Sequence, residues 1–325
     1  MALDPAVLFF VFGVAAGLVR SNLEIPTAIS RFLSLYLLMA IGLKGGFALA
    51  ETGLTREVFV TLGSAVALAF AVPILAFGLL RRWLGSFDAA AVAATYGSVS
   101  AVTFITAMQF LDERSVPYGA HMSAAMALME SPAIFLAVLL ASRYRAQEAR
   151  FSSSGPSSAR SPVSLSAVMH EALTDGAQLL LLGALIVGLV TGQEGQAVMK
   201  PFASDLFKGM LAFFLLDMGL QTARNLPSLR ECSAWALAYA FLAPPVHAAM
   251  ALLLCVWLSI SVGNATLLMV LAASASYIAV PAVIRQAIPE AKPALYFGMS
   301  LGLTFPLNIL LGIPLYSKVA TAVLG

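Results

Sequence analysis

Two short stretches, YGSVSAVT at Tyr96–Thr103 and ASASYIAV at Ala273–Val280, decide the fold because each places small and hydroxyl-bearing residues inside a long apolar run. In a membrane helix such residues let the backbone leave the helical path, which is tolerated only where protein buries the freed groups or a cavity receives them. We therefore expect two broken helices that face each other in mid-membrane. Half-helices that meet there would direct positive N-terminal dipoles at one point, which favours a small anion.

The composition around these stretches is that of a membrane protein. Of the 325 residues, 60% are hydrophobic and 10% are charged, whereas a soluble domain is about a quarter charged. The net charge of +2, without a basic stripe, indicates no nucleic-acid partner. No Lys or Arg precedes the first apolar run, so we expect a retained first span rather than a signal peptide. The spacing of Cys232 and Cys255 suits neither a metal site nor a disulfide framework.

Ten apolar segments approach the length of about 20 residues that crosses the hydrocarbon core as a helix. Between the fifth and the sixth lies a Ser- and Pro-rich stretch, Arg150–Val163, which cannot bury enough surface to fold. We therefore expect a first five-helix repeat at 1–145, a disordered linker at 146–164 and a second five-helix repeat at 165–325. The ten segments are 5–20, 25–50, 57–82, 87–111, 118–142, 168–191, 203–223, 231–260, 264–287 and 292–320.

The two halves share five short motifs in the same order, at offsets of 171 to 177 residues. An odd number of spans in each half places the halves in opposite orientations, as in the inverted repeats of secondary transporters. The predicted fold class is therefore an all-α membrane protein with ten transmembrane helices in two inverted five-helix repeats and broken crossover helices. The motif pairs are Gly17–Val19 with Gly188–Val190, Ala40–Leu43 with Asp217–Leu220, Tyr96–Thr103 with Ala273–Val280, Met122-Ser123 with Met299-Ser300, and Ser131-Pro132 with Phe305-Pro306.

The distribution of Lys and Arg predicts the orientation. Twelve of the eighteen basic residues fall at the ends of spans on the side of the linker, and six fall on the opposite side. Because cytoplasmic loops carry the excess of positive charge, we expect the linker in the cytoplasm and both termini outside, in a bacterial inner membrane.

Candidate ligands for a solute or an ion lie in and beside the two interruptions. The hydroxyl groups of Ser98, Ser100, Thr103, Ser274 and Ser276 offer oxygen atoms to an anion or to a sodium ion. The alternative is that each hydroxyl bonds to its own helix and that the small residues only allow close packing.

Two carboxylates and one histidine also lie within apolar runs. Glu130 precedes Pro132, and Asp217 lies in FFLLDMGL; a charge in the membrane usually pairs, protonates or faces an ion path. Each acid is either functional or a structural acid with bonded partners. His247 follows Pro244-Pro245, where we expect it to satisfy backbone carbonyls freed at a kink. Motifs of metal ligands or of a catalytic serine are absent from the sequence, which argues against an enzyme.

Six further motifs together resemble one family over nearly the whole chain, the sodium-dependent bicarbonate transporter (SbtA-like) family known from cyanobacteria. They are Ile25–Ser30, Ile41–Gly46, Gly97–Thr103, Glu130–Ala133, Ala243–His247, and Ala272–Pro281 followed by Ile288-Pro289. The resemblance implies gate and core domains, a homotrimer, elevator movement of the core and a PII-like regulator on the cytoplasmic face. It also implies bicarbonate carried with sodium and no other cofactor. The implied binding residues are Gly97, Ser98, Ser100, Thr103, Ser274, Ser276, Tyr277 and Glu130, with sodium at Ser98, Ser100, Ser274 and Ser276.

The sequence departs from the family pattern at the implied site. Ser100–Thr103 reads SAVT where the family reads SGST, and Glu130 stands for an Asp. Tyr277 replaces an Asp that would compensate the charge of sodium, and Val280 replaces a Gly, which we expect to crowd the approach of an anion. Two alternatives to sodium-coupled bicarbonate transport stay open. One is a carrier of another small solute that is coupled to protons through Glu130, and the other is a transport-inactive sensor or scaffold.

Overall fold

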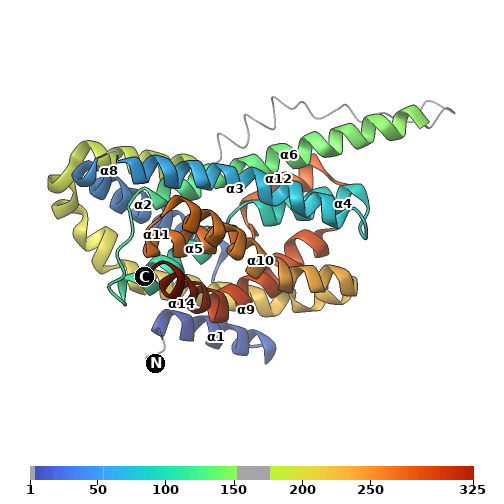
Figure 1. Cartoon of the computed structure of the whole chain (residues 1–325). Helices are drawn as coiled ribbons and strands as arrows, with labels where there is room; N and C mark the ends of the chain where they lie inside the picture. Colours follow the sequence, from blue (N-terminus) through green and yellow to red (C-terminus); the bar gives the residue numbers. More distant parts are fainter. Residues whose placement is uncertain (1–3, 54, 152–175) are drawn as a thin grey trace.

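The structure is a computed structural model that describes residues 4–53, 55–151 and 176–325. Within these ranges every regular element is a helix (Figure 1). The helices of the first half are α1 Pro5–Leu18, α2 Thr27–Thr52, α3 Arg56–Leu80, α4 Ser86–Gly97, α5 Ala101–Asp112 and α6 Met122–Phe151. Those of the second half are α8 Gly176–Lys200, α9 Phe207–Asn225, α10 Ala234–Leu258, α11 Val262–Ala273, α12 Ala279–Ala287, α13 Phe305–Leu307 and α14 Ile313–Leu324.

Shorter helical turns complete the second half. A π turn, Pro201–Asp205, joins α8 to α9, and a 3-10 turn, Leu226–Glu231, follows α9. Three further π turns, Ala294–Gly298, Ser300–Thr304 and Asn308–Gly312, continue through α13 into α14 as one helical stretch.

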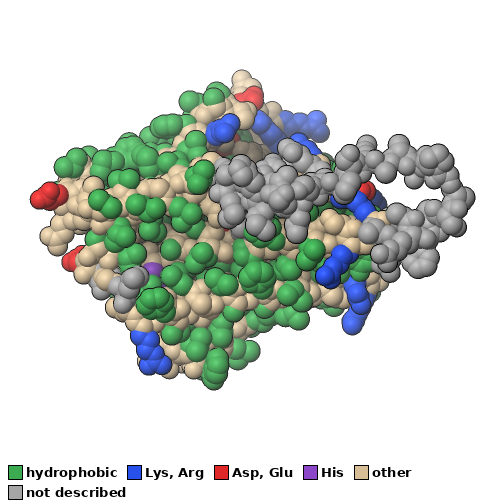
Figure 2. Space-filling view, turned by 90° about the horizontal axis from the view of Figure 1, so that it is seen from above, with side chains coloured by type: hydrophobic (Ala, Val, Ile, Leu, Met, Phe, Trp, Pro, Cys, Tyr) green, Lys and Arg blue, Asp and Glu red, His purple; other side chains and the backbone are tan. Residues whose placement is uncertain are grey.

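Long apolar helices make this an all-α membrane protein. Seven helical stretches of the described residues are long and apolar enough to cross a membrane, and α1 and α11 are shorter apolar helices. Large hydrophobic side chains on their outer faces are exposed; Trp257, for example, is 79% exposed. Figure 2 shows one face that is largely hydrophobic across its middle, with charged side chains towards its edges. Lipid is the solvent that such a surface requires.

Within the described residues the ten apolar segments fall on helices, but some boundaries differ; the start of the sixth segment, residues 168–175, lies outside the described residues. α6 continues to Phe151 and so includes the start of the predicted linker; residues 152–164 of that linker lie outside the described residues. α8 continues to Lys200, past the predicted end at residue 191, and kinks at Gly192, where φ is +53°. A left-handed φ costs little at glycine, so the chain turns there without ending the helix. Both chain ends lie at the same end of the bundle, and α6 projects from the opposite end (Figure 1).

Glycines bring two pairs of helices into close contact. α2 packs along α8, and α1 packs along α9. A Cβ atom added at Gly188 would lie 2.5 Å from the carbonyl oxygen of Leu43, and one at Gly219 would lie 2.3 Å from that of Phe10. Only glycine permits such an approach, which is how small residues bring membrane helices together.

A further pair of contacts joins the two halves in reciprocal fashion. Near the start of α11, the side-chain oxygen of Asn264 accepts a hydrogen bond of 2.6 Å from the amide of Gly119 in the first half. Near the start of α4, Asp88 accepts one of 2.8 Å from the amide of Lys292 in the second half. Each half therefore fixes the loop before the last helical segment of the other.

The α2–α8 contact predicts that alanine substitutions at two glycines of α8 change the stability of the protein differently. Gly188→Ala forces its new methyl group against the α2 backbone, so we expect a loss of about 1–3 kcal/mol. Gly183→Ala is the matched control, since a Cβ there meets nothing within 4 Å and alanine favours the helix by up to about 1 kcal/mol. Thermal unfolding in detergent would measure both. Equal melting temperatures for the two variants would contradict the close packing.

Candidate functional site

Two helices are interrupted at the stretches that the sequence singled out. α4 ends at Gly97, and Ser98 and Ser100 are extended before α5 begins at Ala101. α11 ends at Ala273, and α12 begins only at Ala279. Both predicted interruptions are therefore present.

The two interruptions are bonded directly to each other. The amide of Ser276 donates to the carbonyl oxygen of Thr95 at 2.8 Å. The amide of Ser100 donates to the side-chain oxygen of Ser274 at 3.0 Å. Amides of each interrupted segment thus donate hydrogen bonds to the other segment, because polar backbone groups inside a membrane need such partners.

Side chains complete the caps on the C-terminal end of α11. The Ser274 hydroxyl donates to the carbonyl oxygen of Leu271 at 2.8 Å, and the Asn308 amide donates to that of Ala273 at 2.8 Å. His247 hydrogen-bonds the backbone of Ala272. Since the last carbonyls of a helix have no partner within it, these three side chains allow α11 to end inside the protein.

His247 therefore bonds to the backbone of α11 and not, as the sequence predicted, to the backbone of its own helix. We expected it to satisfy carbonyls at a kink in its own helix, but α10 runs without a break from Ala234 to Leu258 through Pro244 and Pro245. The carbonyl oxygen of Ala240, which Pro244 leaves without an amide donor, accepts the Thr304 hydroxyl at 3.0 Å instead.

Serine side chains cap the two half-helices that start at the interruptions. The Ser100 side-chain oxygen accepts bonds from the Thr103 amide at 3.2 Å and from the Thr103 hydroxyl at 3.0 Å. The Ser276 side-chain oxygen accepts the amide of Val280 at 3.3 Å. The amides that open α5 and α12 have no acceptor within their own helices, so each start remains a donor of positive partial charge.

A cavity of about 140 Å³ lies where the two half-helices begin. The first residues of both, together with side chains of α2, α6 and α8, form its wall. The lining residues are Ser34, Leu38, Val99, Ser100, Ala101, Val102, Glu130, Ala177, Leu181, Ser276, Tyr277, Ile278 and Ala279. One carboxyl group and four hydroxyl groups therefore face a small space that is otherwise apolar.

Tyr277 presents a polar atom without a partner to this cavity. The side chain is 4% exposed, and its ring packs edge-on against Phe305 at 5.1 Å between centroids. The hydroxyl group is close to Ser100, but among the described residues it has no hydrogen-bond partner of good geometry. Because an unpaired buried hydroxyl costs about 1–3 kcal/mol, a ligand that accepts its proton would be stabilised here.

The predicted site residues divide into two groups. Ser100, Ser276, Tyr277 and Glu130 line the cavity. The other four support its walls. The Ser98 hydroxyl donates to the carbonyl oxygen of Glu130 at 3.0 Å, Thr103 and Ser274 bond as described above, and a Cβ at Gly97 would lie 2.5 Å from Pro73.

Val280 does not crowd the cavity. Its side chain is fully buried among apolar residues of α4, α6 and α10 and is not part of the cavity wall. The first turn of α12 directs Ile278 and Ala279 towards the cavity and Val280 away from it, so the larger side chain is accommodated.

Asp217 is a bonded acid within the α1–α9 and α2–α8 region. It is 4% exposed, and its carboxylate accepts the hydroxyl of Ser30 and, at 2.8 Å, the side-chain amide of Gln221. It is not among the lining residues of the cavity. Asp217 is therefore a structural acid with bonded partners, the second of the two interpretations that the sequence allowed.

Some residues that line the cavity were not identified from the sequence, because they lie outside the two interrupted segments. Ser34, Leu38 and Leu181 come from α2 and α8, which are distant in the chain. The spacing of Ser30 and Ser34 along one face of α2 is the pattern that could have indicated them.

Broken helices that end around a buried cavity are typical of membrane transporters, since irregular backbone at membrane depth occurs where it lines such a space. The sequence matches the Na+-dependent bicarbonate transporter superfamily over residues 5–321, nearly the whole chain. The chain therefore belongs to that family, and the resemblance found in its motifs is confirmed. The comparison with individual curated proteins gave no significant match.

The crossing hydrogen bonds predict a specific role for Ser274. Ser274→Ala leaves the buried amide of Ser100 without its acceptor, so we expect a loss of about 1–3 kcal/mol in unfolding free energy and reduced solute binding. Ser64→Ala is the control, because that buried hydroxyl bonds only to its own helix, at Val60. Thermal unfolding of both variants would test this, and equal stability would show that the crossing bond contributes nothing.

Proposed function

We propose that the protein is a secondary active transporter that carries bicarbonate, coupled to sodium, and binds the anion in the 140 Å³ cavity between the two interruptions. The observation that carries this proposal is that α5 and α12 both begin at that cavity. Two helix N-termini offer amide donors and positive dipole ends to one small space. The Tyr277 hydroxyl, which lies close to Ser100, adds a side-chain donor.

The volume of the cavity favours a small solute. A water molecule takes about 30 Å³ of liquid volume, so the cavity holds roughly four or five non-hydrogen atoms. Bicarbonate has four such atoms, and its hydroxyl group can also donate to a Ser or Glu oxygen. A larger organic anion would need the walls to move apart.

The same cavity holds oxygen atoms for a coupling ion. Glu130, Ser100 and Ser276 line it from three different elements, and transporters coordinate sodium with such oxygens near unwound backbone. The negative charge of Glu130 would offset that of a cation beside the anion. Because Glu130 can also titrate, proton coupling is the second candidate, and it rests on this one carboxyl group.

The packing of the helices supports an elevator mechanism within an inverted repeat. Gly17 contacts Leu220 as Gly188 contacts Leu43, and the offsets are those of the repeated sequence motifs. The cavity lies between the closely packed α2–α8 pair and the interrupted helices. Movement of the interrupted helices along that pair would carry the cavity, with its bound solute, across the membrane.

Uptake of labelled bicarbonate into proteoliposomes tests the proposed function directly. We expect uptake that depends on an inward sodium gradient and that continues when the pH gradient is abolished. Uptake that follows the pH gradient alone would replace sodium with protons. Absence of bicarbonate flux under every gradient would refute the transporter proposal and favour a sensor or scaffold.

The Tyr277 hydroxyl predicts a change in affinity. Tyr277→Phe removes one donor to a charged ligand, so we expect the KM for bicarbonate to rise about tenfold with a smaller effect on kcat. Tyr239→Phe is a matched control, because Tyr239 is also buried with an unpartnered hydroxyl but does not line this cavity. An unchanged KM in Tyr277→Phe, or equal changes in both variants, would place the anion elsewhere.

A further inference from the structure

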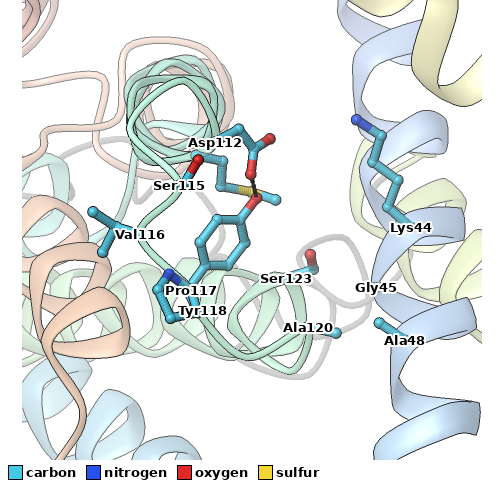
Figure 3. A pocket seen from close by; sticks show the side chains of 11 residues that line it. Lys44, Gly45, Ala48, Asp112, Ser115, Val116, Pro117, Tyr118, Ala120 and Ser123 are labelled. Atoms are coloured by element: carbon cyan, nitrogen blue, oxygen red, sulfur yellow. Dashed lines mark hydrogen bonds between the residues drawn. The ribbon is translucent and has the colours of Figure 1, made fainter.

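A second and larger cavity, of about 470 Å³, lies between α2 and the segment that joins α5 to α6 (Figure 3). One wall belongs to α2 and the opposite wall to the end of α5 and the residues after it. The lining residues are Lys44, Gly45, Ala48, Met108, Asp112, Ser115, Val116, Pro117, Tyr118, Ala120 and Ser123. Glu113 lies between the lining residues Asp112 and Ser115, and it is near enough to Asp4 for the two carboxylates to repel each other. The cavity therefore lies at the end of the bundle where the chain begins.

Lys44 lies inside a membrane-spanning helix and forms no salt bridge in the part of the chain that the structure describes. The carboxylate of Asp112, on the facing wall of the cavity, attracts it across that space. It lies eight residues before the end of α2, which is about 12 Å along the helix axis. Its Nζ atom is held over the ring of Phe207, 4.3 Å from the centroid. The ion pairs found among the described residues, Arg145–Glu290 and Lys208–Glu113, do not include it. A charge at this depth usually pairs or faces an ion path, and here it faces the cavity.

Ser123 supplies a second polar group to the same cavity. Its side chain is 1% exposed, and among the described residues its hydroxyl has no hydrogen-bond partner. α2 approaches closely at this point, because a Cβ at Gly45 would lie 3.1 Å from the Ser123 hydroxyl oxygen. The hydroxyl group therefore lies beside the helix that carries Lys44, buried and free to donate to a ligand.

The opposite wall carries the negative charge of Asp112, which already accepts a hydrogen bond from within the protein. The Tyr118 hydroxyl donates to Asp112 at 2.8 Å, the bond drawn in Figure 3. Burial, together with the charge of Asp112, raises the pKa of Tyr118, so the phenol stays a donor at neutral pH. An anion in the cavity is thus attracted to Lys44 on one wall and repelled by Asp112 on the other.

We propose that this cavity is a docking subsite for a small monovalent anion, where Lys44 and Ser123 hold bicarbonate before it reaches the cavity between the interruptions. The assignment of bicarbonate rests on the proposed function. Both cavities border α2: Leu38 lines the inner one, and Lys44, six residues later, lines the outer one, about 9 Å further along the helix. The buried side chain of Ile41 lies between these levels on the same helix. Repulsion by Asp112 keeps the docked anion weakly bound, which allows it to leave for the second cavity.

Charge-changing variants of the full-length protein, assayed by initial rates of labelled bicarbonate uptake, test this proposal. Lys44→Gln should raise the KM about tenfold with the maximal rate within about twofold, because one charge-assisted contact is lost. Lys44→Arg keeps the charge and should stay within about threefold of the wild-type KM. Ser123→Ala should raise the KM about threefold. A wild-type KM in Lys44→Gln would overturn the proposal.

The Asp112→Asn variant distinguishes two roles of Lys44: binding of an anion, or an ion pair with Asp112 across the cavity. If Lys44 holds an anion, removal of the opposing charge should lower the KM. If Lys44 and Asp112 instead attract each other to close the cavity, Asp112→Asn should raise the KM as Lys44→Gln does, and the proposal fails.

Binding in detergent distinguishes failure of the subsite from failure of the proposed function. Bicarbonate should raise the melting temperature of the wild type through mass action, and Lys44→Gln should reduce that shift. A Lys44-dependent shift without transport would retain the subsite and refute the transporter. A shift that is identical in wild type and Lys44→Gln would refute the subsite even if transport is intact.

Discussion

The whole arrangement depends on the need to satisfy backbone polar groups in a medium without water. Two helices stop in the middle of the protein, and their amides and carbonyls have to find partners there. They find them in each other: Ser276 bonds Thr95 across the crossing, and Ser100 bonds Ser274. The donors left over, at the first turns of α5 and α12, line the space between the interruptions. The interruptions therefore account both for the bonds between the two helices and for the donors that line the cavity.

Residues from several other helices bond to the two interrupted segments and hold them in place. Asn308, from the last helical stretch, and His247, from α10, bond the end of α11. The Ser98 hydroxyl reaches the backbone of Glu130 and so connects the first interruption to α6. Because each of these contacts comes from a different helix, the geometry of the cavity is fixed by the bundle and not by the interrupted segments alone.

Much of this could be predicted from the sequence. Apolar length and composition predicted the helices, and the small residues of Tyr96–Thr103 and Ala273–Val280 predicted where two of them break. Which hydroxyls face the cavity could not be predicted, since Ser98 and Ser100 differ only in the direction of an extended backbone. The contribution of α2 depends on contacts between distant segments. For the same reason, the sequence near Asp217 and His247 did not indicate that they bond Ser30 and the backbone of Ala272.

The two cavities along α2 differ in a way that fits the two steps proposed for an anion. The larger one carries Lys44 opposite the carboxylate of Asp112, whereas the smaller one is lined by the starts of two half-helices and by side chains with hydroxyl groups. A charged side chain attracts an anion over a longer distance than a dipole does, while uncharged donors can bind it without holding it too firmly. Tyr277, where the family pattern has an Asp, makes the wall of the smaller cavity less negative, which favours the proposed anion.

The most direct measurement is a cryo-electron microscopy structure of the protein with bicarbonate and sodium. We expect density for a small solute between the start of α5 and the start of α12, within hydrogen-bond distance of the Tyr277 hydroxyl. Continuous helices through Ser98–Ser100 and Ser274–Ile278, or a solute bound away from both half-helix starts, would contradict it.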